Sequence, residues 1–185
     1  MTDETMTDGN PAQAAWVRQA LDTYERPLLR YAARFTGDLD LARDVVQDAF
    51  VKLCREDPAK LNGRLAPWLY TVCRNRALDV RKMEGRMQAL QQHQAEAQPD
   101  IAPGPGRRAI AREEHALVLE AVAALPANQQ EAFRLKFEHG LTYRDISRVM
   151  NMPLSTVNYT IAQALTAVRT RLHGTIEVPR VNERA

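Results

Sequence analysis

Apolar residues recur three or four positions apart along most of the chain, which is the spacing of one face of an α-helix. Runs that alternate between apolar and polar residues, as half-buried strands do, do not occur in the sequence. An all-α fold is therefore predicted. Glycine and proline gather in residues 98–106, after a segment rich in Gln and Ala that offers little apolar surface. We therefore expect two small helical domains joined by a flexible linker over residues 88–111.

Four amphipathic stretches make up the predicted first domain, residues 12–87, which follows a disordered N-terminus at residues 1–11. They cover residues 14–24, 27–35, 39–55 and 67–82. Pro27 is expected to open or kink the second stretch, because proline is tolerated in the first turn of a helix and disrupts its interior. Gly37 should end that helix, and the carboxylate of Asp38 should cap the next one.

The predicted second domain, residues 112–174, precedes a C-terminal tail at residues 175–185. Its helices are expected over residues 114–125 and 129–138, then from Thr142, and finally from Leu154 to about Leu172. The run from Thr142 to Asp145 has the form of a capping box, Asn151 suits a left-handed turn, and Gly174 should close the last helix. A short helix, a tight turn and a longer helix predict a helix-turn-helix.

The longest helix of the second domain has one apolar and one polar face. The apolar face should pack against the two preceding helices; it consists of Val157, Ile161, Ala164, Leu165, Val168 and Leu172. The polar face and the start of the preceding helix form a candidate surface for duplex DNA: Thr142, Ser155, Thr156, Asn158, Tyr159, Gln163 and Arg169. Amides can pair with adenine in the major groove, whereas hydroxyls and helix N-termini suit phosphates. The alternative interpretation is an ordinary solvated face.

Basic residues are concentrated around the helix predicted over residues 67–82. Residues 64–86 contain six basic side chains and two acidic ones, a local net charge of +4. With an amide and an aromatic ring, they form a second candidate nucleic-acid surface: Arg64, Trp68, Arg74, Asn75, Arg76, Arg81 and Lys82. Clustered cations bind phosphates, and an aromatic ring can stack on an unpaired base. The alternative is a basic face that only keeps the domain soluble, with Trp68 anchored in the core.

Residues 38–57 are acidic by contrast, with six acidic side chains and three basic ones. The outward face of the helix at 39–55 places four polar side chains around one valine: Asp44, Gln47, Asp48 and Arg55 around Val51. An acidic rim would repel DNA and is better suited to contact with another protein. This face is therefore a candidate protein-docking site.

Whole-chain composition excludes several classes of function. The chain has 185 residues and a net charge of +2, so an argument for nucleic-acid binding depends on the local patches. Cys54 and Cys73, without a CxxC pair, give neither a zinc site nor a disulfide framework and suit a reducing cytoplasm. No apolar run approaches about 18 residues, and residues 1–10 are acidic and polar, so neither membrane insertion nor a signal peptide is expected. Motifs for catalysis, metals or cofactors are not found, and none of these is predicted.

Both domains resemble the extracytoplasmic-function group of sigma-70 factors. Residues 39–50 (LDLARDVVQDAF) are similar to the family's helix that docks on the clamp of RNA polymerase. Residues 68–79 (WLYTVCRNRALD) resemble the segment that opens and reads the −10 element. The stretch from Leu125-Pro126, with GLTYRDI at 140–146 and STV at 155–157, resembles the region that reads the −35 element. The likeness covers about residues 12–86 and 112–172.

The resemblance implies an alternative sigma factor that catalyses nothing itself and binds the clamp and flap regions of core RNA polymerase. Promoter DNA would be held as a duplex at −35 and as an unpaired strand at −10, where Asn75 and the loop at residues 58–66 would hold a flipped base. Asp44, Gln47 and Asp48 would face the clamp. An anti-sigma factor is a further partner that the family allows.

The long helix departs from the family pattern. Family members usually carry several Lys and Arg along this helix, where the present chain has Asn158, Tyr159, Thr160, Ala162, Gln163 and Leu165. Fewer phosphate contacts imply a flatter salt dependence for binding at −35.

Two other functions remain open from the sequence. One is a free-standing helix-turn-helix regulator whose N-terminal domain senses a signal or dimerises. The other is a sigma-like decoy without strong −35 binding. Transcription with core polymerase separates them, because only a sigma factor directs initiation from a promoter of its own.

Overall fold

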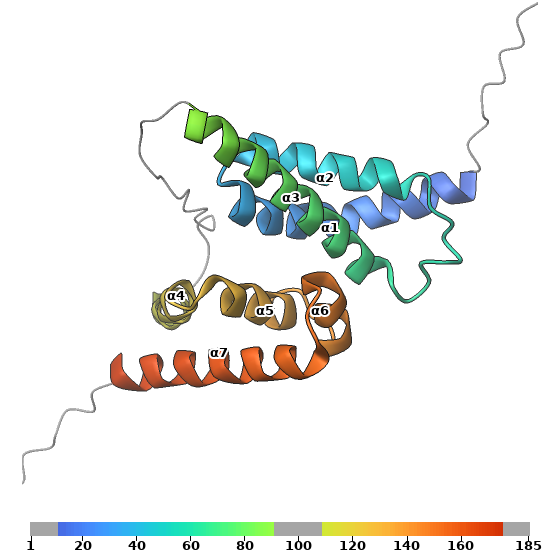
Figure 1. Cartoon of the computed structure of the whole chain (residues 1–185). Helices are drawn as coiled ribbons and strands as arrows, with labels where there is room; N and C mark the ends of the chain where they lie inside the picture. The colour runs from blue at the N-terminus through green and yellow to red at the C-terminus, as the bar shows by residue number, and fades with distance from the viewer. Residues whose placement is uncertain (1–10, 91–108, 176–185) are drawn as a thin grey trace, which may run out of the picture. The chain divides into compact units, whose positions relative to one another are not determined.

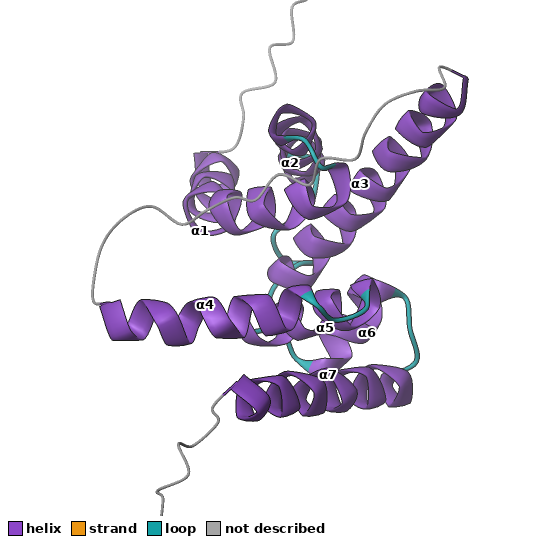
Figure 2. Cartoon of the chain, turned by 90° about the vertical axis from the view of Figure 1, so that its left-hand side faces the viewer, coloured by secondary structure: helices purple, strands orange, loops and turns teal. Residues whose placement is uncertain are grey.

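Two compact helical units make up the part of the chain that the computed structural model describes, residues 11–90 and 109–175 (Figure 1). The first unit contains α1 (Pro11–Thr36), α2 (Leu39–Leu53) and α3 (Leu65–Leu90). The second contains α4 (Ala109–Ala123), α5 (Ala127–Phe137), α6 (Tyr143–Met150) and α7 (Leu154–Thr175). Within these ranges only helices and connecting loops occur (Figure 2), so the all-α prediction is confirmed. Most of the expected N-terminal, linker and C-terminal segments, at residues 1–10, 91–108 and 176–185, lie outside the described residues.

α1 is a single helix of 26 residues with Pro27 in its interior. The sequence predicts that Pro27 either opens a new helix or kinks an existing one. The first of these outcomes does not occur, because Pro27 lies inside α1. An interior proline removes one backbone hydrogen bond and costs about 3 kcal/mol. The helix continues because the turn after Pro27 buries Leu28, Tyr31 and Ala32, and each large buried apolar side chain contributes about 1.5–3 kcal/mol.

The turn between α1 and α2 forms as the sequence predicts. Gly37 has a φ of +69°, a left-handed conformation that glycine adopts without a steric penalty. Its N–H donates to the carbonyl of Ala33 over 2.9 Å. Asp38 then caps α2, because its Oδ1 accepts hydrogen bonds from the backbone N–H groups of Asp40 (2.7 Å) and Leu41 (3.0 Å).

The core of the first unit lies where α1, α2 and α3 pack against one another in pairs. Its largest fully buried members come from all three helices: Leu28, Tyr31, Val45, Leu53, Leu69 and Tyr70. The rings of Tyr31 and Tyr70 meet edge to face with their centroids 5.1 Å apart, and Phe35 packs on Tyr31 at the same separation. Aromatic packing therefore joins α1 to α3.

α3 is longer than the helix predicted over residues 67–82. It begins at Leu65 and continues through Gly85 to Leu90. One glycine in a helix costs only about 1 kcal/mol relative to alanine, so Gly85 does not end it. The basic residues of α3 consequently lie on one long helix.

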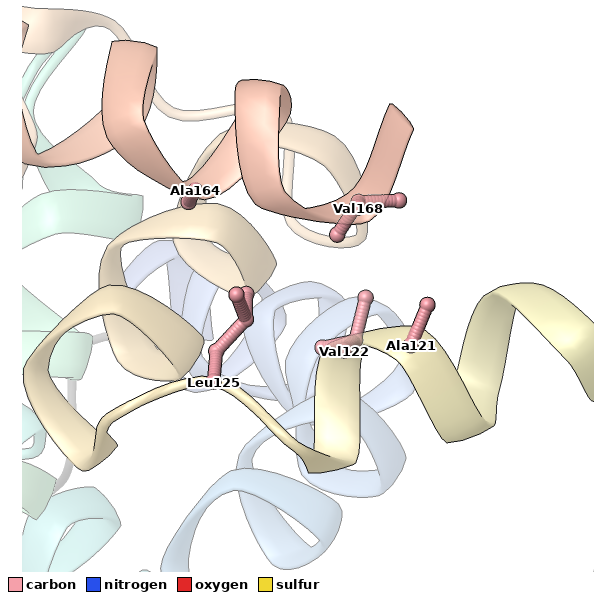
Figure 3. Close-up of a cluster of buried hydrophobic side chains, with 5 residues drawn as sticks. All are labelled: Ala121, Val122, Leu125, Ala164 and Val168. Atoms are coloured by element: carbon pink, nitrogen blue, oxygen red, sulfur yellow. The ribbon is translucent and has the colours of Figure 1, made fainter. Parts of the chain in front are cut away.

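The second unit is organised around α7, which packs against α4, α5 and α6. A cluster of small apolar side chains joins α7 to the end of α4 (Figure 3): Ala121, Val122, Leu125, Ala164 and Val168. Val118, Phe133 and Leu172 pack around this cluster and are partly buried. Of the six residues predicted to form the apolar face of α7, only Leu165 and Leu172 are half-buried, and the other four are buried.

The caps predicted for the helix-turn-helix are confirmed. Thr142 Oγ1 accepts a hydrogen bond from the N–H of Asp145, and the side chain of Asp145 accepts one from the N–H of Thr142, which completes a capping box at α6. Asn151 then adopts a left-handed conformation with φ 51° and ψ 49°. The predicted stop at Gly174 is wrong, because α7 continues to Thr175 and a single glycine in a last turn carries only a small penalty.

Candidate nucleic-acid interface

The outer face of α7 displays most of the polar side chains that the sequence assigns to DNA. Ser155, Asn158, Tyr159, Gln163 and Arg169 are exposed, and Thr156 is half-buried. Thr160 lies between them in sequence but is only 5% exposed, so it belongs to the packing side of the helix. The helix therefore presents a narrow polar face beside its buried stripe.

The electrostatic character of α7 is unusual for a surface that contacts DNA. No charged residue occurs from Leu154 to Val168, and Arg169 and Arg171 follow only near the end of the helix. The phosphate backbone normally dominates affinity through contacts with Lys and Arg. Recognition by the first three turns of α7 would therefore depend on neutral side chains and on the backbone N–H groups at its start.

A chain of three side chains crosses from α5 to α7. Gln129 Nε2 donates a hydrogen bond to Gln163 Oε1 over 3.3 Å, and Gln163 Nε2 donates one to the hydroxyl of Tyr159 over 2.5 Å. Tyr159 remains 64% exposed. The amide of Gln163 is therefore engaged at both of its ends, which the sequence did not indicate.

Thr142 is exposed at the start of α6, but its hydroxyl already serves the capping box. Besides accepting from the N–H of Asp145, the hydroxyl donates to Asp145 Oδ2 over 2.5 Å. Its contribution to DNA binding remains a prediction. The N-terminal end of α6 is capped whichever role this residue has.

On α3, the basic surface is divided between exposed and half-buried side chains. Arg64, Asn75, Arg81 and Lys82 are exposed, whereas Trp68, Arg74 and Arg76 are half-buried. Arg74 also has an interaction within the chain. The structure therefore presents four of the seven residues assigned to this surface openly to solvent.

An ion pair connects α3 to α2. Arg76 Nε lies 2.7 Å from Asp48 Oδ2, and the two side chains are 40% and 48% exposed. The sequence assigned Arg76 to the nucleic-acid surface and Asp48 to the protein-docking face. Each is the other's partner, so neither is simply an outward-facing charge. The rest of the docking face, Asp44, Gln47, Val51 and Arg55, is exposed.

The loop between α2 and α3 forms one wall of a shallow pocket of about 440 Å³, and α1 forms the other. The pocket is lined by Trp16, Pro58, Ala59, Leu61, Asn62, Gly63 and Leu65. Gln13, one turn before Trp16, donates from Nε2 to the carbonyl of Glu56 over 2.8 Å and thereby ties α1 to the start of the loop. Asn75, which the resemblance places with this loop, does not line the pocket.

Sequence reasoning missed Trp16 as a site residue because helical spacing marks it only as an apolar position. Its half-buried ring faces a loop more than 40 residues further along the chain, and no local pattern indicates that contact. The signal that could have found it is the pairing of a large aromatic with a Pro- and Gly-containing loop.

The two cysteines differ in their surroundings. Cys54 is exposed, whereas Cys73 is buried in the core, and burial raises the pKa of its thiol from 9.0 to about 12. No cluster of three or more His, Cys, Asp or Glu side chains suited to a metal ion exists among the described residues. In the same ranges, the structure contains no helix with the length and apolarity needed to cross a bilayer.

Comparison with protein families places two matches on the two units. The family model described as Sigma-70 region 2 matches residues 20–87, and the one described as Sigma-70, region 4 matches residues 115–173. The first match contains most of α1, all of α2, the loop after it and α3 as far as residue 87. The second contains α5, α6, most of α7 and the last turns of α4.

Several sigma factors are similar to this chain over most of its length. The RNA polymerase sigma-H factor of Pseudomonas aeruginosa is 30% identical over 155 residues, which cover 78% of this chain and 80% of the relative. The ECF RNA polymerase sigma factor SigL of Mycobacterium tuberculosis is 27% identical over 165 residues, or 87% and 91% of the two chains. The ECF RNA polymerase sigma-E factor of Escherichia coli is 25% identical over 154 residues, or 78% and 80%.

Two solved structures share the fold at lower identity. One is the sigma factor RpoE of Bartonella quintana in complex with the anti-sigma factor NepR, with a TM-score of 0.61 and 22% identity over 84% of this chain and 96% of that one. The other is CnrH in complex with the cytosolic domain of CnrY, with a TM-score of 0.55 and 20% identity over 90% and 99%.

Proposed function

This chain belongs to the extracytoplasmic-function group of the sigma-70 family and directs RNA polymerase to promoters without catalysing a reaction, and from this premise we propose which of its surfaces performs each task. The family match covers the first unit as well as the second. It therefore argues against a free-standing regulator with an unrelated N-terminal domain. A sigma-like decoy would keep both units, and transcription with core polymerase separates it from a sigma factor.

The first unit would contact two different macromolecules through two faces. We assign the exposed face of α2, with Asp44, Gln47 and Val51, together with Arg55 just after the helix, to the polymerase clamp. The basic face of α3 is assigned to the unpaired strand at −10, because cations on one helix attract phosphates while the acidic side chains on the other exclude them. The observation that carries this assignment is the difference in charge between two segments of one small unit: residues 38–57 have six acidic and three basic side chains, whereas residues 64–86 have two and six.

The pocket beside α3 would accept one unpaired base. Its walls combine a tryptophan ring, an asparagine amide and apolar loop residues. An aromatic face can stack on any base, and an amide can hydrogen-bond the base edge. Trp16 and Asn62 therefore join the residues proposed for the −10 element.

The second unit would bind the polymerase flap and read duplex DNA at −35 through α6 and α7. Ser155, Thr156 and the N-terminal end of α7 would contact phosphates, and Asn158, Tyr159 and Gln163 would face the bases. The near absence of cations on α7 supports a weak but selective contact. We also place the protein in the cytoplasm, where its polymerase and DNA are found.

An anti-sigma factor is proposed as a regulator. One solved structure with a similar fold is a sigma factor in complex with an anti-sigma factor, and another is CnrH in complex with the cytosolic domain of CnrY. The exposed apolar side chains Leu39, Val51, Phe137 and Leu154 offer surface for such a partner.

Transcription with reconstituted holoenzyme tests the proposed function. The full chain and core polymerase should start transcripts from discrete sites on genomic DNA, and core polymerase alone should not. Initiation that is independent of the chain would contradict the proposal. Transcript mapping also identifies a promoter for the tests described below.

Charge reversal on α2 tests the docking face. Asp44→Arg should weaken core binding about tenfold or more, since close charge pairs across interfaces contribute about 1.5–7 kcal/mol. Asp48 is unsuitable for this test, because its reversal would also break the pair with Arg76. Asp22→Arg, at an exposed position of α1, is the matched control, and equal affinity of both variants would disprove the assignment.

A further inference from the structure

The three side chains that connect α5 to α7 point to a positioning role for a residue outside the recognition helix. Gln129 lies in the first turn of α5 and is half-buried. Gln163 and Tyr159 are four residues apart on α7 and share its exposed face. Both hydrogen bonds have the same donor direction: Gln129 donates to Gln163 over 3.3 Å, and Gln163 donates to Tyr159 over 2.5 Å.

We propose that Gln129 is a positioning residue which, through Gln163, holds Tyr159 so that its hydroxyl donates to an acceptor on a base edge of the −35 element. This inference rests on the proposed function of the second unit. It assigns the base contact to Tyr159 rather than to the amide of Gln163.

The hydrogen-bonding capacity of each group leads to this assignment. A glutamine that reads adenine uses its carbonyl oxygen and its NH₂ group together. In this structure one lone pair of the Gln163 oxygen accepts from Gln129 and one of its two N–H groups donates to Tyr159, so the amide plane is already held by two partners within the protein. The Tyr159 oxygen accepts that hydrogen bond, and its own proton remains as the donor that can be directed outward.

The arrangement also reduces the cost of binding. Exposed Gln and Tyr side chains ordinarily lose rotamer freedom when they meet DNA. Here the hydrogen bonds order them before the contact is made, so less conformational entropy remains to be lost. This lower entropy cost matters for the affinity of α7, because its first four turns contain no charged side chain to attract phosphates.

The chemistry of the donor limits which bases are compatible. In the major groove, guanine presents N7 and O6 as acceptors, adenine N7 and thymine O4, whereas cytosine presents an amino donor. A hydroxyl proton directed at the base edge therefore discriminates against cytosine at one position. A phosphate oxygen is also an acceptor, but contact with it would show no base preference.

Selection from a promoter library randomised at −35 tests the proposal with the full chain in reconstituted holoenzyme. The unmodified protein should disfavour cytosine at one position. Tyr159→Phe, Gln163→Ala and Gln129→Ala should each reduce that preference by about three- to tenfold, the effect of one hydrogen bond, at the same position. Thr166→Ala is the matched control, because this exposed hydroxyl bonds back to the carbonyl of Ala162 in its own helix.

The possible results distinguish the positioning role of Gln129 from the base contact of Tyr159 and from the proposed function. If Tyr159→Phe changes the preference and Gln129→Ala does not, the positioning role is wrong. Uniformly weaker binding without a change of base preference would mean a phosphate contact and would overturn the proposal, as would changes at different positions. If the unmodified holoenzyme selects no sequence, the proposed function has failed instead. Equal thermal unfolding temperatures of the variants show that a shift in preference is not a loss of folding.

Discussion

The two helices that we propose to contact DNA differ in character. α3 carries five basic residues and lies next to a pocket lined by Trp16 and Asn62, whereas α7 has no charged residue in its first fifteen positions and displays ordered neutral side chains. Charge supplies affinity with little regard to sequence, and neutral hydrogen-bonding groups supply selectivity with less affinity. Under the proposed assignment, the first unit would supply most of the affinity for DNA and the second would mainly select the sequence.

The largest expected effect comes from removing polar groups of α3. Arg74→Ala combined with Asn75→Ala should slow promoter opening about tenfold or more and leave core binding unchanged, because hydrogen bonds to charged groups contribute about 1.5–3 kcal/mol each. Opening is measured by fluorescence of an unpaired base in a promoter found by transcript mapping. The control replaces Arg30 and Gln19, exposed residues of α1, by alanine. If the variant opens the promoter at the normal rate, the basic face of α3 does not contact DNA, and the proposed difference between α3 and α7 is wrong.

Salt dependence compares the two helices directly. Arg81→Ala with Lys82→Ala should flatten the slope of log K against log salt concentration by about 1.5, since each phosphate contact on single-stranded DNA contributes about 0.7. Arg169→Ala with Arg171→Ala should change it by about 0.9, because only one of these two residues, Arg169, is assigned to the DNA surface and one contact on duplex DNA contributes about 0.9. Titration of holoenzyme with promoter DNA at several salt concentrations measures both slopes. Equal changes would contradict the proposed division of roles.

Alkaline pH should act on the first unit through Cys73. Burial raises the pKa of its thiol to about 12 from 9.0, so an unfolded chain loses this proton near pH 9 while the folded chain keeps it. The contribution of this group is therefore fully present below pH 9 and falls with rising pH, by at most about 1.4 kcal/mol per pH unit. Denaturant unfolding of the wild type and Cys73→Ala at pH 8 to 10.5 measures the difference in slope. Identical slopes would mean that the thiol is solvated in the folded state.

The smallest effect is expected at the capping box of the second unit. Thr142→Ala should lower the free energy of unfolding by about 1 kcal/mol, because the cap hydrogen bonds at α6 are lost. Thermal unfolding detects the change, and Thr166→Ala, which removes a hydroxyl without a capping role, is the control. A reduction in DNA binding much larger than the loss of stability would instead show that the Thr142 hydroxyl contacts DNA.

The sequence predicts local features well. The capping box at Thr142, the left-handed turn at Asn151 and the cap at Asp38 depend on residues within a few positions of one another, and all three are confirmed. The alternation of buried and exposed positions on α7 is likewise a property of one helix. Helix ends follow less closely, because packing in the core can outweigh a proline, as it does at Pro27, and because a single glycine such as Gly85 costs too little to end a helix.

Contacts between distant residues could not be predicted. Arg76 and Asp48 are 28 residues apart, and Gln129 and Gln163 are 34 apart. Helical periodicity shows which side chains leave the core but not which of them meet across two helices. The polar faces were therefore predicted from the sequence. The ion pair between Arg76 and Asp48 and the contribution of Trp16 to the pocket were not.

The ion pair between Arg76 and Asp48 has a consequence for how this protein can diverge. The helix proposed to face polymerase and the helix proposed to face DNA share one charge pair, so a substitution at either position leaves an unmatched charge in the other. A pair that is 40% and 48% exposed contributes only about 0–1 kcal/mol, so we expect exchange at one position alone to be weakly disfavoured rather than forbidden. Change at the polymerase-facing surface is then weakly coupled to change at the promoter-facing one.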